Sequence, residues 1–299
     1  MKKIILMILI ILLIAIAVIV ILSHQPKTLE QPNSNFKIVT SFYPIYIMTS
    51  NLVQDAQNVE LVNMTETNIG CLHDYTLMTA DMRKIESADV FIQNGLGLES
   101  FMEEILSAYS DLKVIDTSVN ITNKIEEEGH ANAHIWTSIP NYISQINEIA
   151  EKLSEYNPEN ADVYSKNVQD YTVKLEELNQ KYQTELTNLT RQKAVCLNEA
   201  FTYLLEDIGL ELINVETDHE ESTLSADTLK NIIHQMKEEN IQMIFVAEED
   251  NQQNANTLVN ETGAKIYSLN TAMTGKLEPD AYIKAMEENL EVLKQINTN

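Results

Sequence analysis

Cysteine is scarce in this sequence, which limits the kinds of site that the chain can build. The 299 residues include only two cysteines, Cys71 and Cys196, which lie far apart along the chain. No Cys-x-x-Cys pair occurs, so zinc-ribbon and haem-attachment motifs are both excluded. Outside a cell the two thiols could form a disulfide, but two separate small buried apolar residues are an equally good interpretation.

Basic residues are also few, at 20 lysines and arginines against 45 aspartates and glutamates, and the formal net charge is −25. Nucleic-acid binding needs a basic surface that neutralises phosphates, so this composition argues against a nucleic acid as partner. A strongly acidic chain suits a protein that handles cations, although acidic surfaces also serve solubility. Charge therefore excludes one class of partner without selecting another.

The common catalytic signatures are missing. The sequence has no His-Glu-x-x-His pair, no Gly-x-Ser-x-Gly elbow, no Walker loop and no Gly-x-Gly-x-x-Gly turn after a predicted strand. A metal-bound water activated by Glu199 is the remaining route to hydrolysis, and it needs an open coordination position. We therefore expect a protein that is not an enzyme.

One long apolar run is present, near the N-terminus. It extends from Ile4 to Leu22 without a charged residue, about 28 Å as a helix, which is enough to cross the bilayer core. Lys2 and Lys3 place its start in the cytoplasm and the rest of the chain outside. A cleaved signal peptide is the alternative, but its small-residue pattern, Ala15-Ile16-Ala17, lies inside the run. We expect a membrane anchor, or a signal that is removed before secretion, over residues 1–23.

After a polar linker over residues 24–35, short β-branched runs alternate with longer segments of helical period. This alternation is typical of parallel sheets covered by helices. Two sets of runs, separated by a gap, predict an α/β fold of two lobes over residues 36–158 and 191–299, each a mostly parallel four-stranded sheet with flanking helices. The predicted strands are Lys37–Ser41, Val59–Val62, Val90–Gln93, Lys113–Asp116, Lys193–Cys196, Glu211–Val215, Met243–Val246 and Lys265–Leu269.

The gap between the two strand sets has a pattern of its own. Residues 159–190 contain no glycine and no proline, and their apolar side chains recur every three or four positions, as on one face of a helix. A coiled-coil partner helix would show the same pattern. Because a strand set lies on each side, we expect one long helix that joins the two lobes.

Four polar residues lie at places where a cleft between the lobes would form. His73 follows the second predicted strand, His134 precedes a helix, Asn198 follows the fifth strand and Asn270 ends the eighth. In open α/β folds, ligands bind beyond the carboxyl ends of the strands. We therefore expect these residues to meet in one cleft, with the two histidines as metal ligands in their neutral form.

The sequence around these residues resembles the zinc- or manganese-specific solute-binding proteins of bacterial ABC importers. The resemblance covers nearly the whole chain after the linker, and its segments are specific only together and in order. They are Thr40-Ser41-Phe42-Tyr43-Pro44-Ile45, His73-Asp74-Tyr75 with Ala88-Asp89-Val90, Asn94-Gly95-Leu96-Gly97-Leu98-Glu99, His134-Ile135-Trp136, Asn198-Glu199-Ala200-Phe201-Thr202-Tyr203, Thr262-Gly263-Ala264-Lys265 and the tail from Tyr282 to Leu290.

The resemblance implies extracytoplasmic binding of a divalent metal ion, Zn²⁺ or Mn²⁺, in the interlobe cleft and its delivery to an ABC transporter permease. In the family, two histidines of the first lobe hold the metal with a histidine or glutamate and an aspartate of the second lobe. The first two positions fall on His73 and His134, the third on Asn198 and the fourth on Asn270. Both asparagines depart from the family pattern, as does Asn132-Ala133 where the family has Asp-Pro.

The two asparagines weaken the expected site, because each offers one neutral carbonyl oxygen in place of a strongly donating ligand. Three outcomes stay open. A neighbour rebuilds the site: Glu199, or Asp218–Glu221, or Glu248–Asp250, or His130, whose spacing from His134 would place both rings on one helix face. The favoured interpretation of His130 is a solvated loop residue, since Gly129 and Ala131-Asn132 are typical of a loop, and Asp218–Glu221 is more simply a solvated turn and Glu248–Asp250 a helix cap. Alternatively, the site binds metal weakly. In the third outcome metal binding is lost and the lobes keep a docking or adhesive role.

Overall fold

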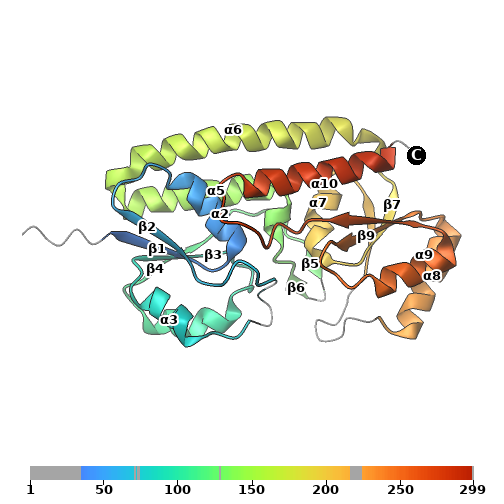
Figure 1. Ribbon diagram of the computed structural model, residues 1–299, viewed down its shortest axis with the longest axis horizontal. Helices are drawn as coiled ribbons and strands as arrows, with labels where there is room; N and C mark the ends of the chain where they lie inside the picture. Colours follow the sequence, from blue (N-terminus) through green and yellow to red (C-terminus); the bar gives the residue numbers. More distant parts are fainter. Residues whose placement is uncertain (1–34, 71, 73–74, 128, 216–223, 298–299) are drawn as a thin grey trace, which may run out of the picture. The chain divides into compact units, whose positions relative to one another are not determined.

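A parallel sheet of four strands forms the centre of the first lobe (Figure 1). The computed structural model describes residues 35–70, 72, 75–127, 129–215 and 224–297. Apolar and β-branched side chains dominate the central strands, which are largely buried, as expected for a sheet covered on both faces. The strands are β1 (Phe36–Thr40), β2 (Val59–Asn63), β3 (Val90–Gln93) and β4 (Lys113–Asp116), in the order β2-β1-β3-β4.

The second lobe repeats this arrangement with a second parallel sheet. Its order is β10-β9-β7-β8, so from the opposite edge its strands follow the same second-first-third-fourth pattern as those of the first lobe. The strands are β7 (Lys193–Cys196), β8 (Glu211–Asn214), β9 (Met243–Ala247) and β10 (Lys265–Leu269). The prediction of two mostly parallel four-stranded sheets is confirmed, and the predicted strand ends differ from those observed by at most one residue.

Helices cover both sheets and place the loops at the strand ends between the lobes. Two of them begin with features that the sequence supplies, since Pro44 lies in the first turn of α2 and the Ser138 hydroxyl accepts the Asn141 N–H at the start of α5. The shorter helices are α2 (Tyr43–Leu52), α3 (Thr79–Glu86), α4 (Glu103–Ala108), α5 (Ile139–Tyr156), α7 (Thr202–Asp207), α8 (Ala226–Glu239) and α9 (Gln253–Thr262).

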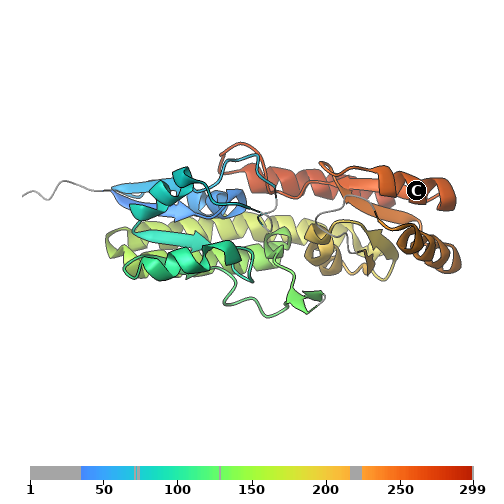
Figure 2. The same ribbon diagram turned by 90° about the horizontal axis from the view of Figure 1, so that it is seen from below.

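One long helix, α6 (Ala161–Glu185), runs past both sheets, with α10 (Ala281–Asn297) beside it (Figures 1 and 2). It packs against α5 and α2 of the first lobe and against α10 of the second. Its buried side chains recur at the spacing that the sequence predicts: Tyr164, Val168, Tyr171, Leu175, Leu178 and Tyr182. The expectation of a long helix that joins two lobes is confirmed.

A continuous apolar core extends through both lobes. One cluster of buried side chains includes Trp136 of the first lobe, Leu175 of α6 and Phe245 of the second sheet. Trp136 also makes polar contacts with the second lobe, because its indole N–H donates to the Thr271 carbonyl and its own carbonyl accepts the Tyr282 hydroxyl. The two lobes are therefore packed together as one unit over residues 36–299.

The segment before His134 differs from the sequence interpretation. It forms a short antiparallel hairpin from β5 (Glu126–Glu127) and β6 (His130–Ala131). The interpretation that places His130 and His134 on one helix face is wrong, since His130 lies in a strand and His134 lies just before a single turn of 3-10 helix, Ile135–Thr137. His130 is exposed at the rim of the hairpin.

Among the residues that the structure describes, no helix combines the length and the apolar character that crossing a membrane requires. The predicted anchor or signal over residues 1–23 lies outside the described residues.

Candidate metal centre

His134 is a buried histidine at the boundary between the lobes. Its exposed fraction is 3%, and its ring packs against the Trp136 indole with 5.1 Å between centroids. On one side of the ring, Nδ1 lies 3.0 Å from the side-chain oxygen of Asn132. The histidine is therefore held in one orientation by packing and by a polar partner, as a metal-ligating imidazole requires.

Glu199 approaches this imidazole from the second lobe. It follows β7 and opens a turn of 3-10 helix, Glu199–Phe201. One carboxylate oxygen lies 3.8 Å from His134 Nδ1, and the side chain is 37% exposed. The structure thus brings an imidazole of one lobe and a carboxylate of the other together, although they are far apart in the sequence.

Asn198 lies beside Glu199, but its amide serves the second lobe itself. Its side-chain oxygen accepts the Ala200 N–H at 3.0 Å, which caps the following turn. Its Nδ2 donates to both carboxylate oxygens of Asp250, at 3.0 and 3.2 Å. Asp250 also accepts the Ala247 N–H at the end of β9, so Asn198 and Asp250 together fasten two neighbouring strand ends.

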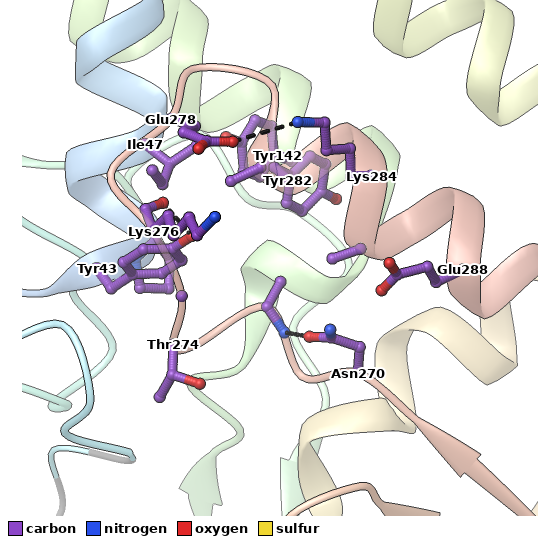
Figure 3. A pocket seen from close by; sticks show the side chains of 15 residues that line it. Tyr43, Ile47, Tyr142, Asn270, Thr274, Lys276, Glu278, Tyr282, Lys284 and Glu288 are labelled. Atoms are coloured by element: carbon purple, nitrogen blue, oxygen red, sulfur yellow. Dashed lines mark hydrogen bonds and ion pairs between the residues drawn. The ribbon is translucent and has the colours of Figure 1, made fainter.

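Asn270 is used in a similar way after β10. Its side-chain oxygen accepts the Ala272 N–H at 2.8 Å (Figure 3). The Asn289 side chain of α10 binds both its backbone N–H and its carbonyl. Asn270 lines a pocket of about 190 Å³ to which α2, α10 and the stacked rings of Tyr142 and Tyr282 also contribute.

A buried carboxylate, that of Glu99, supports the loop that contacts the residue before His134. Glu99 accepts the backbone N–H groups of Asn94 and Gly95, at 2.8 and 3.1 Å, and the Asn94 amide in turn donates to the Ala133 carbonyl. Burial raises the pKa of the Glu99 carboxyl to about 7, although both backbone hydrogen bonds act to lower it. Ala133, next to His134, is therefore held by the Asn94 loop, and the Glu99 carboxyl that binds this loop changes its charge near neutral pH.

Several predicted ligands cannot be placed. His73 and the segment Asp218–Glu221 lie outside the described residues, as does Cys71, the possible disulfide partner of Cys196. Within the residues that are described, no group of three or more histidine, cysteine, aspartate or glutamate side chains gathers as metal ligands would. Of the predicted donors that the structure describes, His134 and Glu199 are a pair that meets across the two lobes.

Sequence reasoning missed the polar contacts behind these donors. The sequence marks Asn132 only as a departure from a pattern and Asp250 only as one acidic residue in a run, whereas Asn132 contacts His134 and Asp250 contacts Asn198. Glu249 accepts the Thr271 hydroxyl at 2.7 Å, so it too is engaged near the loop that follows β10. No local pattern predicts the Asn198–Asp250 and Glu249–Thr271 contacts, because each joins the ends of different strands. Asn132 and His134 are two residues apart, a spacing at which an asparagine side chain commonly accepts a backbone N–H, so this signal was present in the sequence.

Comparison with known proteins gives a consistent result. The family described as zinc-uptake complex component A, periplasmic, matches residues 38–296. A zinc-binding lipoprotein, AdcA of Streptococcus pneumoniae, is 29% identical over 289 residues, which cover 89% of this chain and 56% of AdcA. The chain thus spans little more than half the length of that relative. The high-affinity zinc uptake system protein ZnuA of Bacillus subtilis is 27% identical, with 86% of each chain covered.

A solved structure supports the same assignment. FpvC from Pseudomonas aeruginosa in complex with Mn²⁺ superposes with a TM-score of 0.79 at 26% sequence identity, covering 89% of this chain and all of that one. The resemblance found in the sequence and the two-lobed fold are therefore confirmed. The matched family is a component of an uptake complex, which agrees with the expectation that the chain is not an enzyme.

Proposed function

We propose that this chain, which belongs to the family of periplasmic zinc-uptake complex component A proteins, binds a divalent metal ion outside the cytoplasm and delivers it to the permease of an ABC importer. Relatives named for zinc binding and zinc uptake, and a similar fold that holds Mn²⁺, support Zn²⁺ or Mn²⁺ as the ion. The ion is cargo and not a resident cofactor. Its site lies where the strand ends of the two lobes meet.

The pairing of His134 with Glu199 across the lobes carries this proposal. A buried imidazole and a partly exposed carboxylate are ligands that both zinc and manganese accept. His73, to which the resemblance assigns the role of a second histidine ligand, would give a set of two imidazoles and one carboxylate. Glu199 brings a negative charge of the second lobe next to His134, because its rotatable side chain lies beside the ring, 3.8 Å from Nδ1.

Asn198 and Asn270 rank behind Glu199 as metal ligands. Each side-chain oxygen already accepts a backbone N–H two residues further on, and Asn198 also binds Asp250 through its Nδ2. A neutral amide oxygen that shares its lone pairs with a backbone donor adds little to the binding of a divalent ion. The expected site is therefore weaker than one with two additional charged or imidazole ligands.

The proposed function also assigns a role to each part of the chain. Residues 1–23 anchor the protein in the membrane or direct its secretion, and residues 24–35 link this segment to the lobes. Residues 36–158 form the first lobe, 159–190 the connecting helix and 191–299 the second lobe. In this arrangement the metal site lies outside the cytoplasm, where an importer would take over its ion.

A metal titration of the full chain, purified in detergent, tests the proposal. We expect one Zn²⁺ or Mn²⁺ per chain in the wild type and loss of that ion in His134→Ala and His73→Ala. His234→Ala is the matched control, because His234 is an exposed histidine on α8 that contacts Glu238 at 3.3 Å, away from the strand ends. If the wild type binds no ion, the protein is a degenerate family member whose role is docking or adhesion. If all three variants bind the ion as the wild type does, the ion lies elsewhere and His134 is not its ligand.

A further inference from the structure

The geometry points to Asn132 as a positioning residue that fixes the tautomer of His134. In this tautomer Nε2 carries the lone pair that binds the metal. Asn132 also connects His134 to the second lobe. This inference deepens the proposed function and rests on it for the identity of the ligand. Asn132 is itself buried, with 5% of its surface exposed. It lies between β6 and His134, where the hairpin returns to the first lobe.

The hydrogen-bond pattern identifies which side-chain atom of Asn132 faces His134. The backbone N–H of His134 can only donate, and it lies 2.9 Å from this atom, so the atom must be the amide oxygen. The other end of the amide lies 3.0 Å from the carbonyl oxygen of Glu199, which can only accept, so that end must be the NH₂ group. Two partners with fixed roles thus determine the orientation of the amide independently.

This orientation determines the protonation of the imidazole ring. The same Asn132 oxygen lies 3.0 Å from His134 Nδ1. Because the oxygen has no hydrogen to donate, a hydrogen bond at this distance needs the hydrogen on Nδ1. In a neutral imidazole the lone pair then belongs to Nε2, which becomes the nitrogen available to a metal ion.

Glu199 does not replace Asn132 in this role. Its nearest carboxylate oxygen is 3.8 Å from Nδ1, beyond the length of a hydrogen bond. A neutral amide also adds no charge beside the ring, so it selects the tautomer without favouring the imidazolium form, which cannot bind metal. The carboxylate of Glu199 keeps its capacity as a ligand.

The backbone of Asn132 is fixed by the second lobe as well. Its carbonyl accepts the Tyr203 hydroxyl at 2.9 Å, and the same hydroxyl accepts the Ile125 N–H at 3.0 Å. The Asn132 N–H donates to the Ile125 carbonyl at 2.8 Å. Tyr203 is buried on α7 of the second lobe. Asn132 therefore fixes the position of the His134 ring, in the first lobe, relative to the Glu199 backbone, in the second.

The test compares the His134 tautomer and the zinc affinity of the full chain in detergent, for the wild type, Asn132→Ala, Asn132→Asp and Tyr203→Phe. Histidines are labelled with ¹⁵N, because the nitrogen chemical shift separates an N–H nitrogen from one with a lone pair. Spectra are recorded after metal removal at a pH well above about 6.5, where an ordinary histidine is neutral. His134→Gln assigns the His134 signal by its loss.

We expect the wild type to show hydrogen on Nδ1. Asn132→Ala should move hydrogen to Nε2 and lower zinc affinity by about 10- to 100-fold, the usual effect of losing such a partner. Asn132→Asp should restore the wild-type tautomer, because a carboxylate oxygen accepts the same two N–H groups. Tyr203→Phe removes a support of the Asn132 backbone and keeps the acceptor, so its tautomer should stay unchanged.

Two results would overturn the inference: a wild-type signal with hydrogen on Nε2, or an Asn132→Ala variant that keeps both the tautomer and the zinc affinity. If Asn132→Ala does not fold, the wild-type spectrum still decides, since the geometry allows only one tautomer. A wild type that takes up neither zinc nor manganese would refute the proposed function, and the metal-free spectra would then support or contradict the effect of Asn132 on His134 separately.

Discussion

The two lobes share one strand order but use their polar residues at the strand ends differently. In the first lobe, buried amides and a buried carboxylate support the segment that carries His134. In the second lobe, the side chains of Asn198 and Asn270 cap turns of their own lobe. In the first lobe these contacts support the histidine that we propose as a ligand, whereas in the second lobe the amides hold turns and Glu199 is the carboxylate that we propose as a ligand.

Removing the first-lobe ligand should have the largest effect. His134→Ala deletes an imidazole donor, so we expect zinc binding to disappear, a greater loss than the roughly 10- to 100-fold typical of an outer partner. Isothermal titration of the wild type, His134→Ala and the control His234→Ala measures the difference. Equal affinities in all three proteins would place the metal elsewhere.

Glu99, which holds the loop next to His134, should make the stability of the protein depend on pH. Burial raises the pKa of Glu99 to about 7 from 4.5, so the folded state binds a proton more tightly than the unfolded state. This contribution is fully present below pH 4.5 and is lost as the pH rises to about 7, by roughly 3 kcal/mol.

The Gln side chain of Glu99→Gln cannot titrate, so the stability of this variant should not show the loss between pH 4.5 and about 7. Urea unfolding of the metal-free chain between pH 4.5 and pH 7.5 compares the two proteins, and other titrating groups cancel in the difference. Curves that run parallel over this range would mean that Glu99 keeps an ordinary pKa in the folded protein.

Restoring charge to the second lobe should have an intermediate effect. Asn270→Asp puts a carboxylate where the family has one, and we expect zinc affinity to rise by about tenfold, the factor that corresponds to ~1.4 kcal/mol. Asn256→Asp, which adds the same charge at an exposed position on α9 of the same lobe, is the control. A rise in both variants would reflect net charge alone, and a rise in neither would show that position 270 does not face the ion.

The smallest effect concerns one of the hydrogen bonds that join the lobes. Tyr282→Phe removes the hydroxyl that donates to the Trp136 carbonyl at 2.9 Å but keeps the stacked ring, so it should destabilise the fold by about 1 kcal/mol. Thermal unfolding measures this loss. Tyr267→Phe, in the second lobe, is a comparison in which no interlobe contact changes. A larger loss in Tyr267→Phe would indicate that the interlobe bond contributes little.

The sequence predicted the fold well because strand and helix patterns are local. Runs such as Met243–Val246 place apolar residues at consecutive positions, and the side chains of the long helix recur every three or four residues. The hairpin of β5 and β6 escaped prediction, since each strand has two residues and none of the β-branched residues that mark a strand.

The site could be predicted only in part. The sequence brought His134 and Glu199 forward as candidates, and the structure places them next to each other. The roles of Asn132, Asn198 and Asn270 depend on which donors and acceptors surround each amide in the folded chain. An amide can donate and accept, so its residue type alone does not say whether it caps a turn, orients a histidine or binds a metal.

Crystals of the zinc-loaded chain, with anomalous diffraction measured at the zinc absorption edge, test the central claim most directly. The account predicts one zinc peak about 2.0–2.2 Å from both His134 Nε2 and a Glu199 carboxylate oxygen. A zinc ion bound through Nδ1, or one that leaves either residue outside its coordination sphere, would contradict it.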